Sequence, residues 1–257
     1  MLHLDKRIYH LHPKGGTPML LFYVRHGDPI YNPDQLTPLG ERQAESVAKR
    51  LSLYGVDHIY ASTSTRAKQT AQPLCEILKK DMTLLDFTNE GHVYDDFSII
   101  DENGERIWAL QKLENQRLMA SAAMRKLGFD WYTHPDLPDC NWEGGFQRIQ
   151  EETDKFLFSL GYQHIKESGT YRILKSNQER IALFAHGQFG VGFLSALLDI
   201  PYPLCVSHLE MCHSGVTVIE FREGEDGLAM PQILTLSNDS HLYRDGLPTK
   251  YNNRLYI

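Results

Sequence analysis

Short apolar runs alternate with amphipathic stretches along the first part of the chain. Residues 19–24 form an uninterrupted apolar run, which is typical of a strand that is covered on both faces of a sheet. Residues 58–61 and 82–87 predict two more strands, and apolar positions recur at helical spacing between the three runs. The order strand, helix, strand, helix, strand indicates a largely parallel sheet covered by helices.

Capping signals mark the two helices that this pattern predicts. Thr37 is a candidate N-cap, Pro38 stands at the first helical position, and Gly55 marks the end. The second helix begins near Arg66, and Pro73 is expected to kink it or shift its start. Both helices therefore connect successive strands of the predicted sheet.

The rhythm changes after the third strand. Residues 91–160 read as long helical stretches without an obvious strand, separated by a loop rich in proline and glycine. We expect residues 91–170 to form a helical cap inserted into a single α/β domain that spans residues 1–257, with a mainly parallel central sheet flanked by helices. The alternation then resumes, with a helix at residues 189–198 and strands at residues 171–174, 181–185, 216–221 and, as an edge strand, 231–236.

Composition narrows the classes of partner. The chain has 257 residues, 42% of them hydrophobic, and a formal net charge of −7, which argues against a surface adapted to nucleic acid or to an anionic membrane. It has no apolar run long enough to cross a membrane, and residues 1–16 lack the features of a signal peptide, so we expect a cytoplasmic protein. The four cysteines are too few and too irregularly spaced for a disulfide framework, which predicts buried free thiols.

Two histidine–glycine pairs stand where predicted strands end. Arg25, His26 and Gly27 follow the first apolar run, and His186 and Gly187 follow the run at residues 181–185. In open parallel α/β sheets, ligands bind just beyond the carboxyl ends of the strands, and glycine lets backbone N–H groups approach an anion. Most histidines lie on the surface or in a satisfied core, but packing does not require two such pairs at strand ends.

Arginines suggest which anion the site would take. Arg25 and Arg66 carry planar, permanently charged forks that suit the oxygens of a tetrahedral phosphate. Arg66 also stands near a predicted helix start, where unpaired N–H groups favour an anion. Together with His26 and His186, these side chains predict a phosphate site.

Four stretches of the sequence, in this order, resemble one family. Residues 23–27 with Asn32, residues 36–44, residues 62–71 and residues 184–187 are similar to the motifs of the histidine phosphatase superfamily, in its phosphoglycerate mutase-like branch. Residues 91–170 do not match the common motifs of that branch. The resemblance therefore covers the predicted α/β core and leaves the cap undefined.

The resemblance implies a two-step phosphoryl transfer. Neutral His26 would attack phosphorus, and water would hydrolyse the resulting phosphohistidine. Phosphoryl transfer asks mainly for positioning and electrostatics, so no metal and no other cofactor is expected. The residues that would hold the phosphoryl group are Arg25, Asn32, Arg66, His186 and Gly187.

The family also supplies a carboxylic acid shortly after the third strand, which protonates the leaving oxygen. Glu90 fits that place best by its spacing after Arg66. Three other acidic residues are close enough in sequence to remain alternatives, and solvated loop charge is their ordinary role. These alternatives are Asp86, Asp95 and Asp96.

The function expected from these features is a phosphatase, a phosphoric monoester hydrolase, that acts on a small phosphorylated metabolite. A phosphoglycerate mutase-like transfer is the alternative, but the run that surrounds the acid in close mutases is absent, since Gly91 and His92 follow Glu90. A module that binds a phosphorylated ligand without turnover is the alternative from another class. The preferred ester and the oligomeric state do not follow from the sequence.

Two further groups of residues each have a competing interpretation. One cysteine and histidine cluster does not have the spacing of a standard zinc site, so packing before a strand is favoured over a metal site: Cys205, His208, Cys212 and His213. An aromatic group in the cap either lines a substrate pocket or holds the cap's helices together: Trp108, Trp131, Tyr132 and Trp142.

Overall fold

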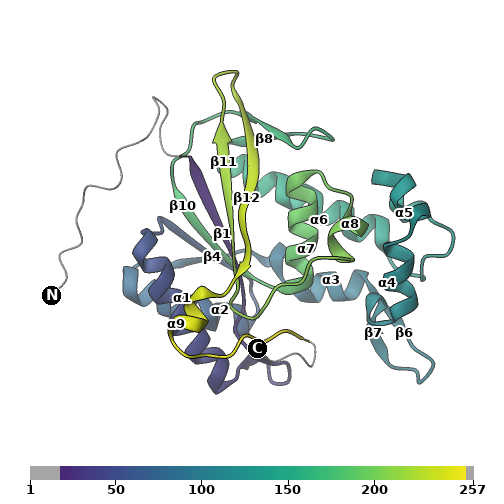
Figure 1. Cartoon of the computed structure of the whole chain (residues 1–257), viewed down its shortest axis with the longest axis horizontal. Coiled ribbons are helices and arrows are strands. Elements are labelled where there is room, and N and C mark those ends of the chain that lie inside the picture. The colour runs from purple at the N-terminus through teal and green to yellow at the C-terminus, as the bar shows by residue number, and fades with distance from the viewer. Residues whose placement is uncertain (1–17, 253–257) are drawn as a thin grey trace.

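The computed structural model describes residues 18–252, and an eight-stranded sheet forms its centre (Figure 1). Residues 1–16, on which the signal-peptide prediction rests, lie outside the described residues. The order across the sheet is β5-β4-β10-β1-β11-β12-β9-β8. The bounds are β1 (Met19–Arg25), β4 (His58–Ala61), β5 (Met82–Leu84), β8 (Tyr162–Ile165), β9 (Thr170–Ile173), β10 (Arg180–Ala185), β11 (Val216–Glu223) and β12 (Leu228–Asn238).

The sheet has a parallel half and an antiparallel half. Strands β5, β4, β10 and β1 run parallel to one another, as the alternation of strands and helices predicted. From β1 onward each neighbour is antiparallel, beginning with β11, whose Val216 pairs with Val24. The α/β fold class is therefore confirmed, with a mixed sheet whose parallel strands form one half.

Helices cover both faces of this sheet. Helices α1 (Pro38–Tyr54) and α2 (Thr65–Leu78) pack on one face, where Phe22 and Val24 join their core. Helices α6 (Trp142–Ser159) and α7 (Gly187–Leu198) pack on the other face with Leu21 and Tyr23 (Figure 1). The alternate side chains of β1 thus enter two different cores, which explains why that strand is apolar throughout.

The predicted capping signals of the first helix act as expected. The Thr37 side chain accepts a hydrogen bond from the Gly40 N–H at 3.0 Å, and Gly55 ends α1 in the left-handed region, at φ 73°. Ser64 caps α2 in the same way, and α2 continues through Pro73 to Leu78. Both ends of α1 and the start of α2 thus lie within one residue of their predicted positions.

The prediction that residues 91–160 contain no strand was wrong. After α3 (Glu90–Asp96), strands β6 (Ser98–Ile100) and β7 (Arg106–Trp108) form a hairpin, and each is too short to show a period of two. Strand β8 lies inside the range predicted as the cap but belongs to the central sheet. The third predicted strand also ends early, because residues 86–88 form a 3-10 turn.

The remaining elements are short. They are β2 (Pro29–Ile30), β3 (Gln35–Leu36), α4 (Leu113–Met119), α5 (Ala122–Leu127), α8 (Tyr202–Val206), α9 (Ser240–Arg244) and two 3-10 turns at residues 109–111 and 128–133. Strand β12 was predicted at the sheet edge, but β9 pairs with its first two residues, Leu228 and Ala229. Among the described helices, none is both long and apolar enough to cross a membrane.

The aromatic side chains of residues 91–170 pack mainly against one another. Trp131 is buried and lies 5.8 Å from Trp142 and 5.3 Å from Tyr202, measured between ring centroids. Trp142 in turn stacks on Phe97 at 4.8 Å. These contacts connect α3, α6 and α8, and they favour the interpretation that the group holds helices together.

Candidate active site

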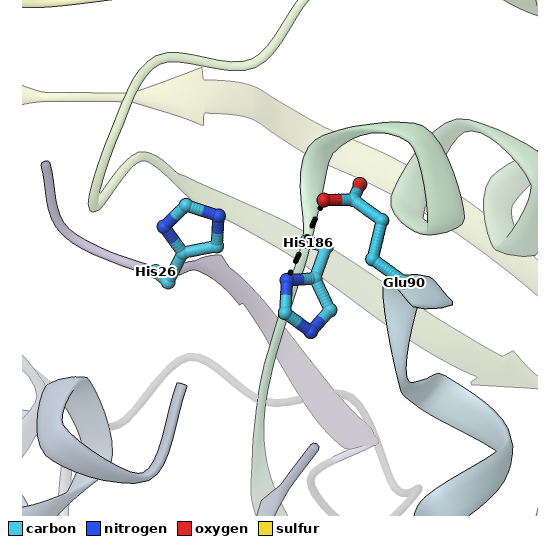
Figure 2. Close-up of side chains that lie close together, drawn as sticks. All are labelled: His26, Glu90 and His186. Atoms are coloured by element: carbon cyan, nitrogen blue, oxygen red, sulfur yellow. Dashed lines mark ion pairs between the residues drawn. The ribbon is translucent and has the colours of Figure 1, made fainter. Parts of the chain in front are cut away.

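The two histidines at the strand ends meet beside Glu90 (Figure 2). His26 follows β1, His186 follows the neighbouring strand β10, and the His26 N–H donates to the Ala185 carbonyl at 2.9 Å. Glu90 is the first residue of α3. One side-chain nitrogen or oxygen from each of the three lies within 4.8 Å of the others, and all three residues are buried.

His26 is held as a neutral imidazole. Its Nδ1 lies 2.7 Å from the Gly27 carbonyl oxygen, and because a carbonyl only accepts, Nδ1 carries the proton. Its Nε2 is buried and has no hydrogen-bond partner among residues 18–252. Burial lowers the pKa of this imidazole well below its usual range, and the nearby His186 and two arginines lower it further. The ring therefore presents an unprotonated nitrogen, which is the form that can act as a nucleophile.

Arg66 joins the other predicted groups. Its Nη2 donates to His186 Nδ1 at 3.1 Å and lies 3.4 Å from Glu90 Oε2. Since a guanidinium only donates, the His186 ring carries its proton on Nε2, which donates to Ser62 Oγ at 2.8 Å. Burial, and then the two arginines, lower the pKa of His186 well below its usual range. His186 is thus neutral and orients Arg66.

Arg25 lies against the start of α7. Its side chain is 1% exposed, and its Nη1 donates to the Met211 carbonyl and lies 3.3 Å from Glu210 Oε1. A Cβ on Gly187 would lie 3.2 Å from Cζ and Nε of Arg25. A side chain at the first position of α7 would therefore force the guanidinium to shift by a few tenths of an ångström.

Both arginines retain a donor without a partner. The Nε atoms of Arg25 and Arg66 are buried and, like His26 Nε2, have no hydrogen-bond partner within the described part of the chain. Unpaired buried donors cost free energy, and a phosphoryl group offers several acceptor oxygens to charged donors. The arrangement can therefore bind a tetrahedral oxyanion beside His26.

Tyr23 in β1 and Gly27 just after this strand fix this geometry. The Tyr23 hydroxyl donates to the His186 carbonyl at 2.6 Å and accepts from the His186 N–H at 3.2 Å, which couples the two strand ends. The Gly27 N–H donates to Thr70 Oγ1 at 3.0 Å, and a Cβ on Gly27 would lie 2.6 Å from the Gly40 carbonyl oxygen. The loop after β1 can pass this close to α1 only because residue 27 is glycine.

Of the four candidate acids, the structure brings Glu90 to the two histidines. Its Oε1 accepts from the Gln188 N–H at 2.9 Å, and its Oε2 lies 3.7 Å from His186 Nδ1, the contact marked by the dashed line in Figure 2. The three alternatives instead pair with side chains elsewhere, namely Asp86 with His92, Asp95 with Arg106 and Asp96 with Arg148.

Asn32 is exposed in the turn between β2 and β3. Its neighbours in that turn reach Arg66: Asp34 pairs with Nη1 at 2.7 Å, and the Tyr31 ring lies 5.2 Å from the guanidinium carbon. The predicted contact of Asn32 with a phosphoryl group stays a prediction.

The site contains a third histidine that the sequence analysis assigned to packing. His213 stacks on His26, and its N–H donates to the Lys250 carbonyl at 2.8 Å. The signal that could have revealed it is strand direction: because β11 runs antiparallel to β1, the residues just before β11 lie at the carboxyl end of β1.

Asp28 connects this histidine to the chain's last described residues. Its Oδ1 accepts from Lys250 Nζ at 2.8 Å and lies 3.2 Å from His213 Nδ1, while Oδ2 accepts from Thr37 Oγ1 at 2.7 Å. Burial would raise the pKa of Asp28, but these partners hold it well below its usual range. Through Asp28 and His213, the C-terminal segment therefore packs near His26.

His26, Glu90 and His186 form the one group of three possible metal ligands found among residues 18–252. The Arg66 guanidinium contacts both Glu90 and His186, so a cation there would face a fixed positive charge. Two members of the cysteine and histidine cluster have different partners: His208 lies 3.0 Å from Arg125, whereas Cys212 contacts Ser237.

Comparison with known proteins gives matches over part of the chain. Residues 21–96 match the model of the histidine phosphatase superfamily, branch 1. The probable phosphoglycerate mutase GpmB of Yersinia enterocolitica is 37% identical over 65 residues, which cover 22% of this chain. The match spans 30% of the length of that relative, so it concerns only part of that protein.

Solved structures share the fold over most of the chain. A phosphoserine phosphatase mutant from Entamoeba histolytica, in complex with phosphoserine, has a TM-score of 0.58 at 18% identity and covers 87% of this chain and 99% of its own. A mycobacterial glucosyl-3-phosphoglycerate phosphatase in complex with VO3 has a TM-score of 0.56 at 18% identity. The match covers 85% of this chain and 99% of the phosphatase chain. At this identity the likeness shows the fold alone.

The family match falls on the strand and helices that carry His26, Arg66 and Glu90, and the fold brings them to His186 at the carboxyl ends of β1 and β10. This part of the chain is therefore similar to the histidine phosphatase superfamily, branch 1.

Proposed function

We propose that this protein is a phosphatase that hydrolyses a small phosphate monoester through a phosphohistidine on His26. The observation that carries the proposal is the neutral, buried imidazole of His26. Among residues 18–252 its Nε2 has no hydrogen-bond partner, and neither do the Nε–H donors of the two arginines beside it. The family match over residues 21–96 supports it, as does the shared fold of structural neighbours named phosphoserine phosphatase and glucosyl-3-phosphoglycerate phosphatase.

In the first step, His26 Nε2 attacks phosphorus and the bond between phosphorus and the leaving oxygen breaks. Protonated Glu90 gives its proton to that oxygen, so the alcohol leaves neutral and Glu90 becomes a carboxylate. The hydrogen bond from Nδ1–H to the Gly27 carbonyl stabilises the positive charge that the ring acquires.

In the second step, water attacks the phosphohistidine and the bond between phosphorus and Nε2 breaks. The Glu90 carboxylate accepts a proton from that water, which restores the acid and the neutral imidazole and releases inorganic phosphate. The same carboxyl group therefore serves as acid and then as base, and its hydrogen bond to the Gln188 N–H keeps it in place for both steps.

Arg25 and Arg66 hold the phosphoryl oxygens in this proposal and offset the charge of the transition state. His186 contributes by orienting Arg66 through its Nδ1, and Gly187 leaves room for Arg25. Asn32 is assigned to the phosphoryl group by the family resemblance.

The proposed reaction needs no metal. The charge that a metal would supply comes from the two guanidinium groups, and Arg66 lies between the groups that could ligate a cation. Removing divalent ions should therefore leave the rate of hydrolysis unchanged.

To test the proposal, the release of inorganic phosphate is measured with a panel of monoesters in the presence of EDTA. The panel includes phosphoserine, 3-phosphoglycerate and sugar phosphates. His26→Ala should abolish release, and His58→Ala, an exposed histidine on β4, serves as the matched control. Circular dichroism is used to check that both variants are folded. Release that survives in folded His26→Ala contradicts the nucleophile, and release lost in EDTA contradicts metal independence.

Phosphoryl transfer of the mutase kind is the second candidate, favoured by the Yersinia enterocolitica relative named a probable phosphoglycerate mutase. Incubation with labelled 3-phosphoglycerate distinguishes the two: a mutase yields the 2-phospho isomer, whereas the proposed phosphatase yields free phosphate. Binding of phosphate without any label on His26 would instead identify a binding module.

A further inference from the structure

Each arginine of the site is paired with a carboxylate that the sequence motifs did not single out. Arg66 Nη1 lies 2.7 Å from Asp34 Oδ1, and Arg25 Nη1 lies 3.3 Å from Glu210 Oε1. Asp34 is anchored, because its Oδ2 accepts from the Thr65 N–H at 2.6 Å. Glu210 Oε1 also lies 3.3 Å from the Met211 N–H. The two carboxylates are thus held against the predicted phosphate-binding groups by more than one contact.

Exposure shows on which side these carboxylates stand. The side chains of Arg25 and Arg66 are 1% and 10% exposed, whereas those of Glu210 and Asp34 are 51% and 31% exposed. The carboxylates therefore lie on the solvent side of the guanidinium groups. A monoester bound to buried His26 must extend its leaving group toward solvent, and hence past this acidic rim, which we define as Asp34 and Glu210.

The acidic rim changes the charge that a leaving group meets. The negative charges of the two rim carboxylates balance the positive charges of the two guanidinium groups. The phosphoryl group of a bound substrate adds further negative charge. A second negative group on the substrate would stand beside carboxylates at short range, where like charges repel. An ammonium group in the same place would be attracted, and a hydroxyl group would be tolerated.

We infer that Asp34 and Glu210 select phosphate monoesters whose leaving group is uncharged or carries an ammonium group, and that they disfavour leaving groups with a carboxylate or a second phosphate. This inference rests on the proposed phosphatase activity and adds the substrate class. It also predicts weak activity on phosphoglycerates and bisphosphates, because both carry the second negative group.

The experiment compares three two-carbon esters: ethanolamine phosphate, hydroxyethyl phosphate and phosphoglycolate. They differ in one terminal group, which is an ammonium, a hydroxyl or a carboxylate. Values of kcat/KM are measured for the wild type, Asp34→Asn, Glu210→Gln and the control Glu225→Gln, an exposed carboxylate in the turn between β11 and β12. His26→Ala shows which part of the release depends on the proposed nucleophile.

The wild type should prefer ethanolamine phosphate and hydroxyethyl phosphate over phosphoglycolate. Asp34→Asn and Glu210→Gln should each reduce the preference for ethanolamine phosphate over phosphoglycolate by about tenfold, whereas Glu225→Gln should leave it unchanged. A wild type that prefers phosphoglycolate, an unchanged ratio in both rim variants, or an equal loss on all three esters would overturn the inference. Absence of any His26-dependent release would instead overturn the proposed function.

Discussion

The imidazole of His213 stacks on that of His26, with ring centroids 5.7 Å apart and 27° between the ring planes. His213 Nε2 lies 2.9 Å from Asn252 Oδ1, and its Nδ1 faces Asp28 at 3.2 Å. Burial lowers the pKa of His213, although Asp28 opposes the shift. A second imidazole ring therefore covers one face of the proposed nucleophile and restricts its rotation.

Removing that ring should slow the chemical step. His213→Ala frees the His26 ring to turn away from phosphorus, and misplacement by about 1 Å can reduce a rate by roughly a hundredfold. We expect kcat to fall by about ten- to a hundredfold while KM changes little, as measured by steady-state phosphate release. The control is His208→Ala, an exposed histidine on the same loop. A kcat of His213→Ala equal to that of the wild type would show that the ring has no positioning role.

The role assigned to Glu90 depends on the leaving group. Glu90→Gln cannot protonate the leaving oxygen, so hydrolysis of alkyl phosphates should fall by roughly a hundredfold or more. Hydrolysis of p-nitrophenyl phosphate, whose leaving group needs little protonation, should fall much less in that step. Comparing kcat/KM for both esters in Glu90→Gln and in Asp86→Asn tests the choice of acid. Equal losses on the two esters in Glu90→Gln would argue for a purely structural role.

The pKa of His26 should depend on its neighbouring charges. Burial lowers this pKa, and the Arg25 charge lowers it further, because a positive neighbour disfavours the imidazolium. The wild type should therefore keep His26 neutral below the ordinary histidine pKa of about 6.5. Arg25→Gln should move the pKa upward, toward that value. Titration of the histidine side chains by NMR measures the shift, with Arg42→Gln on the exposed face of α1 as control, and a downward or absent shift would contradict the argument.

His164, which lies outside the candidate site, should make the stability of the fold decrease as the pH becomes alkaline. Burial alone would lower its pKa, but hydrogen bonds to Asp154 at 2.8 Å and Asp199 at 2.9 Å outweigh burial and raise it to about 9. A folded pKa above the unfolded value means that the charged ring stabilises the fold fully below the unfolded pKa of about 6.5. This contribution is lost as the pH rises through about 9.

The test is thermal unfolding of the wild type and His164→Gln between neutral and alkaline pH. At neutral pH the wild type should be more stable, by of the order of 1 to 3 kcal/mol, which corresponds to several degrees in Tm. The difference should shrink as the pH rises toward 10, since the wild-type ring loses its proton. A difference in Tm that stays constant over this range would show that the charge of His164 does not contribute.

Features that depend on local sequence were the ones that could be predicted. The boundaries of α1 follow from Thr37, Pro38 and Gly55, and the apolar run of β1 follows from its burial on both faces. His26 and His186 were found because each comes directly after such a strand. In each case a few adjacent residues carry the whole signal.

Features that depend on distant pairing were missed. His213 and Glu210 lie at the site because β11 runs antiparallel to β1. The residues around them in the sequence contain no signal for the direction of that strand. Asp34 reaches Arg66 through the small β2–β3 hairpin, whose two-residue strands have no recognisable period. The β6–β7 hairpin was not predicted either, because its strands have only three residues each.

The strand order has a consequence for how the protein folds during synthesis. Strand β10 lies between β4 and β1, although it leaves the ribosome long after both of them. Residues 21–96, which contain the family match, therefore cannot complete their own sheet, because β4 and β1 have no direct pairing. Until β10 has been synthesised, β1 and β4 each have an unpaired, apolar strand edge. Pairing strands that are so far apart in sequence favours slow folding and assistance by chaperones.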